Sequence, residues 1–367
     1  MNPTLAWYFR RYFPWIFFVA AVVLPLLFAS DYRLFQLTMV VVYAVAVLGL
    51  NLLTGFNGQV SLGNGAFYAI GAYVTAIMMD KWDVPYWATL PVSAVICAGV
   101  GFLIGLPALR LGGMYLALTT FALAVATPQL LKYKAFENYT GGVQGIVIDK
   151  PDAPFGLPLS PDQWIYLFAL AVGGLLFLAA TNIVRGRIGR AMRAIRDQPT
   201  AAEAMGIDIA LFKTRAFATS AMYTGIAGSL GAITIQFVAP DAFGVSISLT
   251  FFVGMVVGGG ASIAGAIMGA LFIQFIPNIA DEISKAAPGA VYGLILIAFM
   301  FLLPGGLASL LRLFNRGRAT PMAAVAAAGF TNLPKQAGVP DQLAPEIDNP
   351  RRPHAAAPVN RSASEPQ

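Results

Sequence analysis

Long apolar runs dominate this sequence and limit what it can fold into. Of its 367 residues, 58% are hydrophobic and only 11% are charged. A bilayer core of about 30 Å needs roughly 20 helical residues, and this length divides the chain into apolar segments. These cover residues 14–29, 34–53, 66–79, 87–106, 114–131, 164–183, 214–237, 246–257, 263–280 and 290–303. The sequence therefore predicts an all-α integral membrane protein, a polytopic helical bundle of about 8–10 transmembrane helices.

The charged residues test this division. Short loops rich in Lys and Arg stay on the cytoplasmic side of a membrane. If all segments cross and both termini are cytoplasmic, Arg110, the polar loop 185–213 and the basic residues after position 311 fall inside. The loop 132–162 then falls outside. An even, smaller number of crossings, with a short re-entrant piece in each half, fits the charges almost as well, so both topologies stay open.

Composition also suggests three parts along the chain. Residues 1–33 form an N-terminal cytoplasmic stub and a first transmembrane helix, which we interpret as retained because no small-residue cleavage site follows it. Residues 34–314 form the main transmembrane domain, with an external loop at 132–162 and a cytoplasmic loop at 185–213. Residues 315–367, rich in Ala, Pro, Arg and Ser, are predicted to be a disordered cytoplasmic tail.

Several classes of function are disfavoured by what the sequence contains. The single cysteine, Cys97, and the single histidine, His354, leave no set for a cysteine or histidine metal site or a Ser-His-Asp site. No phosphate-binding Gly-x-x-x-x-Gly-Lys motif occurs, so any ATP must be hydrolysed elsewhere. The net charge is +6, and the basic residues that produce it lie in loops and near the chain ends. Orientation in the membrane explains this placement better than binding to nucleic acid does. We therefore expect neither an enzyme nor a nucleic-acid-binding protein.

Two glycine-rich breaks interrupt the apolar pattern, at residues 55–65 (the first break) and 258–265 (the second break). Non-helical backbone at membrane depth leaves amide groups unpaired unless protein or a wet cavity satisfies them, so such breaks often border a pathway. Two ordinary turns outside the bilayer are the alternative. The candidate pathway residues are Asn57, Gly58, Gln59, Ser61, Gly63, Asn64, Gly259 and Ser262.

Glycines four residues apart predict close helix packing. Such pairs let neighbouring backbones approach and gain contacts that lipid does not supply. They are Gly101 with Gly105, Gly254 with Gly258, and Gly265 with Gly269.

The loop 185–213 contains a predicted short helix. Pro199 suits the first helical position, Asp197 or Gln198 can cap it, and Gly206 suits the left-handed position after it. A helix of under two turns is far below the about 12–15 residues that an isolated helix needs. Something must pack against its Ala and Met face. The loop is either solvated and merely sets topology, or carries a helix seated in a separate protein.

A series of short motifs carries a resemblance to a known family. They are Gly58-Gln59-Val60-Ser61-Leu62-Gly63, Gly71-Ala72-Tyr73, Leu109-Arg110-Leu111, Thr140-Gly141-Gly142 with Gly145, Gly189-Arg190-Ala191-Met192-Arg193, Ala201-Ala202-Glu203-Ala204-Met205-Gly206 and Pro304-Gly305-Gly306-Leu307. In order and spacing, over about residues 34–312, they resemble the branched-chain amino acid ABC transporter permeases of the LivM type.

The resemblance implies an importer subunit of the bacterial inner membrane that works by alternating access. Its implied partners are a second related permease in a heterodimer, two ABC ATPases that bind ATP and Mg, and a periplasmic binding protein; this chain would hold no cofactor. The residues implied to couple to the ATPase are Arg196, Pro199, Ala202, Glu203, Ala204 and Gly206. Those implied to dock the binding protein are Thr140, Gly141, Gly142 and Gly145.

The chain departs from the family pattern at two positions. Many relatives carry histidine where Asn64 stands and an acidic residue near Val125. Permeases for urea, short amides or aromatic carboxylates share the signature and stay open as alternatives. A stand-alone channel or secondary transporter is the alternative of another class, although almost no ionisable residue lies near the middle of a segment.

Overall fold

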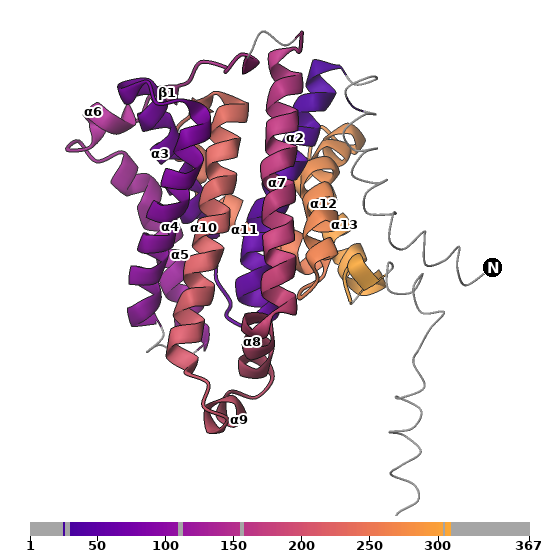
Figure 1. The fold of residues 1–367 in the computed structure, drawn as a ribbon. Coiled ribbons are helices and arrows are strands. Elements are labelled where there is room, and N and C mark those ends of the chain that lie inside the picture. Colours follow the sequence, from indigo (N-terminus) through magenta and orange to yellow (C-terminus); the bar gives the residue numbers. More distant parts are fainter. Residues whose placement is uncertain (1–24, 26–29, 109–112, 155–157, 304, 310–367) are drawn as a thin grey trace, which may run out of the picture. The chain divides into compact units, whose positions relative to one another are not determined.

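The computed structural model describes residues 25, 30–108, 113–154, 158–303 and 305–309. The predicted first span, apart from Pro25, lies outside these residues, as do Arg110, the tail and His354. Each of the other predicted segments corresponds to a helix (Figure 1). They are α2 Asp31–Leu50, α3 Asn64–Trp82, α4 Tyr86–Ala108, α5 Gly113–Leu131, α7 Pro161–Arg185, α10 Ile209–Ile235, α11 Val245–Gly258, α12 Ile263–Ile283 and α13 Pro288–Leu302.

Five stretches in the described residues are long and apolar enough to cross a bilayer: 31–56, 86–106, 161–185, 240–258 and 263–283. The apolar helices at 115–131 and 288–302 are shorter. These findings confirm a helical, multi-pass membrane protein. The helices α3 and α10 are not among the five, and most of their residues are buried, with α10 packed on α2, α3 and α4. A helix enclosed by other helices meets little lipid and tolerates small and polar residues.

Glycine allows the interior helices to touch backbone to backbone. A Cβ added at Gly71 of α3 would lie 2.0 Å from the carbonyl oxygen of Gly225 in α10. The predicted pairs in α11 and α12 behave likewise, because a Cβ at Gly269 of α12 would lie 1.9 Å from the Gly254 carbonyl oxygen in α11; Gly101 and Gly105 of α4 instead face side chains of α10. No side chain fits at these positions. The prediction of close packing at Gly254 and Gly269 is therefore confirmed.

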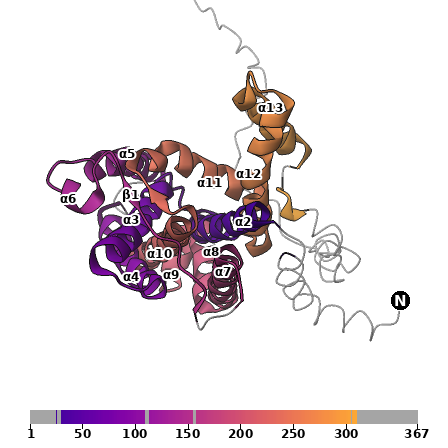
Figure 2. The same cartoon turned by 90° about the horizontal axis from the view of Figure 1, so that it is seen from above.

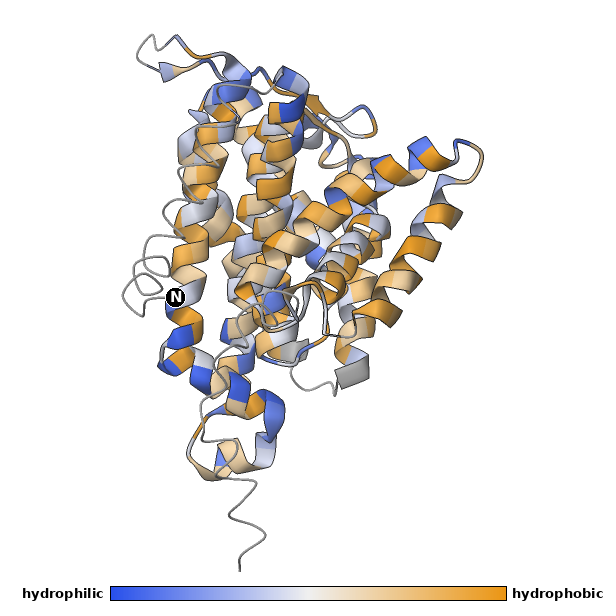
Figure 3. Cartoon of the chain, turned by 90° about the vertical axis from the view of Figure 1, so that its right-hand side faces the viewer, coloured by the Kyte–Doolittle hydropathy of each residue, from blue (hydrophilic) through white to orange (hydrophobic). Residues whose placement is uncertain are grey.

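Short elements lie at the two ends of the bundle (Figure 1). One end, called the β1 end, carries α6 Glu137–Thr140 and the strand β1 Ile146–Val147, which pairs antiparallel with β2 Phe237–Val238 before the 3-10 turn η3 Pro240–Phe243. The opposite end, called the α9 end, carries α8 Arg187–Asp197 and α9 Pro199–Ala204. Hydrophilic residues gather at these ends, with apolar helices between them (Figure 3).

The helix α13 lies at the periphery, beside α12 and away from α2 (Figure 2). None of its residues is buried, and Phe301 is 85% exposed. An apolar helix with such exposure requires lipid or another protein beside it.

Candidate functional site

The first break begins with a change of helix type. The helix α2 continues into a π-helical turn, η1 Asn51–Phe56, and then into a loop that ends at Gly63. Single π turns within helices often mark functional sites because they widen the backbone locally. Gly58 follows with a φ of +75°, a conformation that glycine adopts without strain.

Asn51 joins the two breaks. Its Oδ1 accepts a hydrogen bond from the Ala261 backbone N–H at 2.8 Å, and its Nδ2 donates to the Ser262 carbonyl oxygen at 2.7 Å. The side chain is fully buried. Gly55 lies beside this contact and leaves room for it, because a Cβ at Gly55 would lie 2.5 Å from the Ala261 nitrogen. We call Asn51, Gly55, Ala261 and Ser262 the break junction.

Sequence reasoning missed Asn51. Its signal was a lone amide side chain in the last turn of an apolar run, but nothing near it in the sequence identifies a partner more than 200 residues away. Of the predicted residues of the second break, Ser262 contacts Asn51 directly through its backbone, whereas Gly259 faces Gly305 and Ala308.

The rest of the first break is held by a polar cluster within the bundle. Asn64 donates through Nδ2 to Thr224 Oγ1 at 3.0 Å and to Ser220 Oγ at 3.3 Å, both in α10, and its Oδ1 accepts from Ser61 Oγ at 3.3 Å. The Gly65 N–H donates to Ser248 Oγ in α11 at 2.9 Å. The predicted residues Ser61 and Asn64 are therefore buried, with protein partners.

Two further predicted residues differ in how well they are satisfied. Gln59 donates through Nε2 to the Lys213 carbonyl oxygen of α10 at 3.2 Å. Asn57 is buried too, but neither polar atom of its side-chain amide has a hydrogen-bond partner among the described residues.

The second break folds into a compact turn. Gly259 has a φ of +108°, and a Cβ there would lie 3.1 Å from the Gly305 carbonyl oxygen. The Leu307 N–H donates to the Val257 carbonyl oxygen at 2.8 Å, so residues 305–309 pack on this turn. Ser262 Oγ accepts from the Gly265 N–H at 3.2 Å and caps α12.

The helix α8 contacts the first break directly. Arg196, in its last turn, donates through Nη1 to the Gly55 carbonyl oxygen at 2.9 Å. A Cβ at Gly58 would lie 2.7 Å from Arg196 Cγ, so glycine makes room for the arginine stem. Sequence analysis did not predict α8, although buried Met192 and Ile195 mark its inner face. Arg196 thus faces its own chain's break.

The helix α9 matches its prediction. Pro199 is its first residue, Gln198 is the N-cap residue without a side-chain capping bond, and Gly206 follows with a φ of +80°. Only Ala202 is buried within the chain, whereas Glu203 and Ala204 are exposed and Met205 is 83% exposed.

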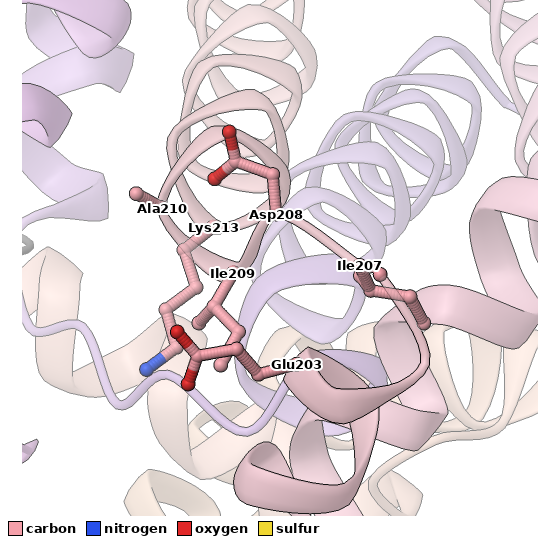
Figure 4. A pocket seen from close by; sticks show the side chains of 7 residues that line it. Glu203, Ile207, Asp208, Ile209, Ala210 and Lys213 are labelled. Carbon is pink, nitrogen blue, oxygen red and sulfur yellow. The ribbon is translucent and has the colours of Figure 1, made fainter.

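A hollow of about 460 Å³ lies between α9 and the start of α10. Glu203, Asp208 and Lys213 surround it, together with the apolar side chains Ile207 and Ile209 (Figure 4). Acidic, basic and apolar side chains therefore all line the hollow.

At the β1 end, the predicted docking residues shape the loop. Thr140 Oγ1 donates to the Leu131 carbonyl oxygen at 2.8 Å, and Gly141, Gly142 and Gly145 all have positive φ. These residues form turns, and the large exposed side chains belong to their neighbours Tyr139, Val143 and Val147. Lys132 and Asp241 form an ion pair between this loop and η3.

Comparisons with known proteins agree with this architecture. Residues 32–303 match the family model of the permease component of branched-chain amino acid transport systems. The chain is 30% identical to the high-affinity branched-chain amino acid transport permease LivM of Escherichia coli, over 75% of this chain and 69% of that one. It is 26% identical to a probable permease, LivH, of Methanocaldococcus jannaschii, over 71% of this chain and 86% of that one. No solved structure matches.

The matched region includes both breaks, α8, α9 and the loop at the β1 end. With most of its length covered by the family model, this chain belongs to the family of permease components of branched-chain amino acid transport systems.

Proposed function

We propose that this chain is one of two related permease subunits in an ABC importer that carries branched-chain amino acids across the bacterial inner membrane. The α9 end faces the cytoplasm, as do both termini, and separate ATPase subunits bind ATP and Mg there. A periplasmic binding protein delivers substrate at the β1 end. Transport proceeds by alternating access.

One observation carries this proposal: an exposed helix without a full packing partner is linked to the first break. The helix α9 has a single buried residue, Ala202, yet it is too short to be stable alone. It follows α8 after one residue, Gln198, and α8 holds the Gly55 carbonyl oxygen through Arg196 at 2.9 Å. A partner that binds α9 and moves it would therefore displace α8 and, through Arg196, the first break.

The partner that this end fits is an ATPase subunit. Met205 and Ala204 offer apolar contact, and the hollow between Glu203 and Lys213 offers room for a protruding side chain of either charge. Buried, well-packed anchors of this kind provide most of the affinity in protein interfaces.

At the β1 end, Tyr139, Val143 and Val147 provide an exposed surface for the binding protein. The turns at Thr140, Gly141, Gly142 and Gly145 hold this surface in shape. In this proposal they act as supports for docking and make no contact themselves.

The test is Glu203→Arg in the complex reconstituted with its ATPases and loaded binding protein. Because Glu203 lies both on α9 and on the wall of the hollow, we expect substrate-stimulated ATP hydrolysis to be lost while membrane insertion is retained. Glu282→Arg, at an exposed position in the last turn of α12, is the matched control and should hydrolyse ATP normally. Normal stimulation in Glu203→Arg would refute the assignment of α9.

Uptake competition tests the substrate. Leucine and valine should compete with labelled leucine in proteoliposomes, and urea and benzoate should not. Uptake of labelled urea or benzoate, with no uptake of labelled leucine, would instead favour the amide or aromatic carboxylate alternatives.

A further inference from the structure

A groove of about 300 Å³ lies between α4, α7, α8 and α10, close to the α9 end. Its walls include Phe102 of α4, Met192 of α8 and Met222 of α10. Of the residues that line it, only Arg215 and Thr219 carry polar side chains. This groove is separate from the breaks and from the hollow beside α9.

Arg215 supplies a positive charge at this groove. It is exposed, and its guanidinium has no hydrogen-bond or ion-pair partner within the described part of the chain. The Thr219 hydroxyl is already engaged, since it donates to the Arg215 carbonyl oxygen at 2.8 Å. A guanidinium is always charged, and it pairs with phosphate through two parallel hydrogen bonds.

The position of Arg215 suits a lipid headgroup. It is the seventh residue of α10, so it lies about 9 Å along the helix from its start at the α9 end. A long cationic side chain at this depth extends toward the headgroups. The apolar part of the groove then lies at the depth of the acyl chains.

The surface around the groove is also one that lipid covers. Leu103 of α4 is 67% exposed, and Leu175 and Leu178 of α7 are 67% and 66% exposed. The helices α4, α10 and α7 stand side by side at this face, with α8 below them (Figure 1). The groove therefore opens onto a surface that needs an apolar environment.

We propose that this groove is a specific site for one anionic phospholipid. One acyl chain lies against Phe102, Met192 and Met222, and the phosphate pairs with the Arg215 guanidinium. Since Met192 belongs to α8, the bound lipid contacts the same helix that holds the first break through Arg196.

The experiment is native mass spectrometry of the full complex released from nanodiscs that contain equal phosphatidylglycerol and phosphatidylcholine with matched acyl chains. An interfacial basic residue contributes about 1 kcal/mol toward anionic lipid, so we expect about fivefold preferential retention of phosphatidylglycerol. Arg215→Gln should remove this preference. Arg33→Gln, at an exposed arginine in the first turn of α2, is the matched control and should keep it.

A second variant tests the acyl part of the site. Met222→Trp fills the groove and should lower the retention of both lipids. Equal phosphatidylglycerol retention in the unaltered complex and Arg215→Gln would overturn the proposal. So would cross-linking of Phe102→Cys to the second permease subunit with no lipid retained, because the groove would then be a subunit interface.

Discussion

The two breaks are both rich in glycine, but they are built differently. Glycines of the first break make room for other elements: a Cβ at Gly58 would lie 2.7 Å from Arg196 Cγ in α8, and a Cβ at Gly65 would lie 2.4 Å from Ser248 Oγ in α11. The first break is therefore a meeting point of several helices.

In the second break, Gly258 and Gly265 close the turn on itself, and Gly259 makes room for residues 305–309. A Cβ at Gly258 would lie 2.1 Å from the Gly265 carbonyl oxygen, within the same turn. Its contact with the first break depends on Asn51 and Gly55. The comparison indicates that displacement of α8 acts on the first break, and that the second break follows through the break junction.

Asn51→Leu is expected to have the largest effect on stability. Leucine has a similar size but cannot pair with the Ala261 N–H or the Ser262 carbonyl, and each unpaired buried group costs about 1–3 kcal/mol. We expect a loss of about 2–4 kcal/mol in unfolding free energy, measured by denaturant titration in detergent. Asn182→Leu, at an exposed position in α7, should change little. Equal losses in the two variants would mean that the breaks are not joined through Asn51.

Gly55→Ala should have the next largest effect. Its Cβ would lie 1.9 Å from Asn51 Oδ1, and overpacking of this kind costs about 1–3 kcal/mol. Gly260→Ala is the matched control, because the nearest atom to its Cβ is 3.8 Å away. Thermal unfolding of the two variants checks the difference. A Gly260→Ala variant as unstable as Gly55→Ala would contradict the comparison between the breaks.

Ser262→Ala should have a smaller and local effect. The side chain caps α12, and loss of a cap costs about 1 kcal/mol. The bond from Asn51 uses the Ser262 backbone carbonyl, so the break junction should persist and transport should continue. Denaturant titration and an uptake assay measure these outcomes; loss of transport at unchanged stability would assign the hydroxyl a direct role.

Much of the fold was predictable from local pattern. Apolar run length predicted the long helices, since lipid demands about 20 apolar residues per crossing; these are α2, α3, α4, α5, α7, α10, α11, α12 and α13. Pro199 and Gly206 predicted the start and the end of α9, because each favours one backbone conformation. These signals need no knowledge of distant residues.

The connections between elements were not predictable in the same way. In the sequence, Asn51 is a single polar residue in an apolar run. Its partners Ala261 and Ser262 contribute only backbone atoms to the hydrogen bonds, so their side chains do not identify them as partners. The helix α8 was missed because its sequence is rich in arginine, so the two buried apolar residues of its inner face, Met192 and Ile195, do not form a clear apolar pattern. Which residues contact partner subunits stays a prediction.

The most direct test of the account is the amount of substrate taken up per ATP hydrolysed in proteoliposomes that contain the complete importer, with Arg196→Gln compared to Arg190→Gln. Arg196 links α8 to Gly55, whereas the one side-chain hydrogen bond of Arg190 to another described residue is to the nearby Arg185 carbonyl oxygen, at 3.4 Å. Coupling free energies of about 1–3 kcal/mol correspond to changes of about fivefold or more.

We therefore expect Arg196→Gln to hydrolyse ATP with uptake per ATP lowered about fivefold or more, and Arg196→Lys, which keeps one charged donor, to recover part of it. Arg190→Gln should match the unaltered importer. The same uptake per ATP in Arg196→Gln and Arg190→Gln would contradict the claim that the movement of α9 reaches the first break through Arg196.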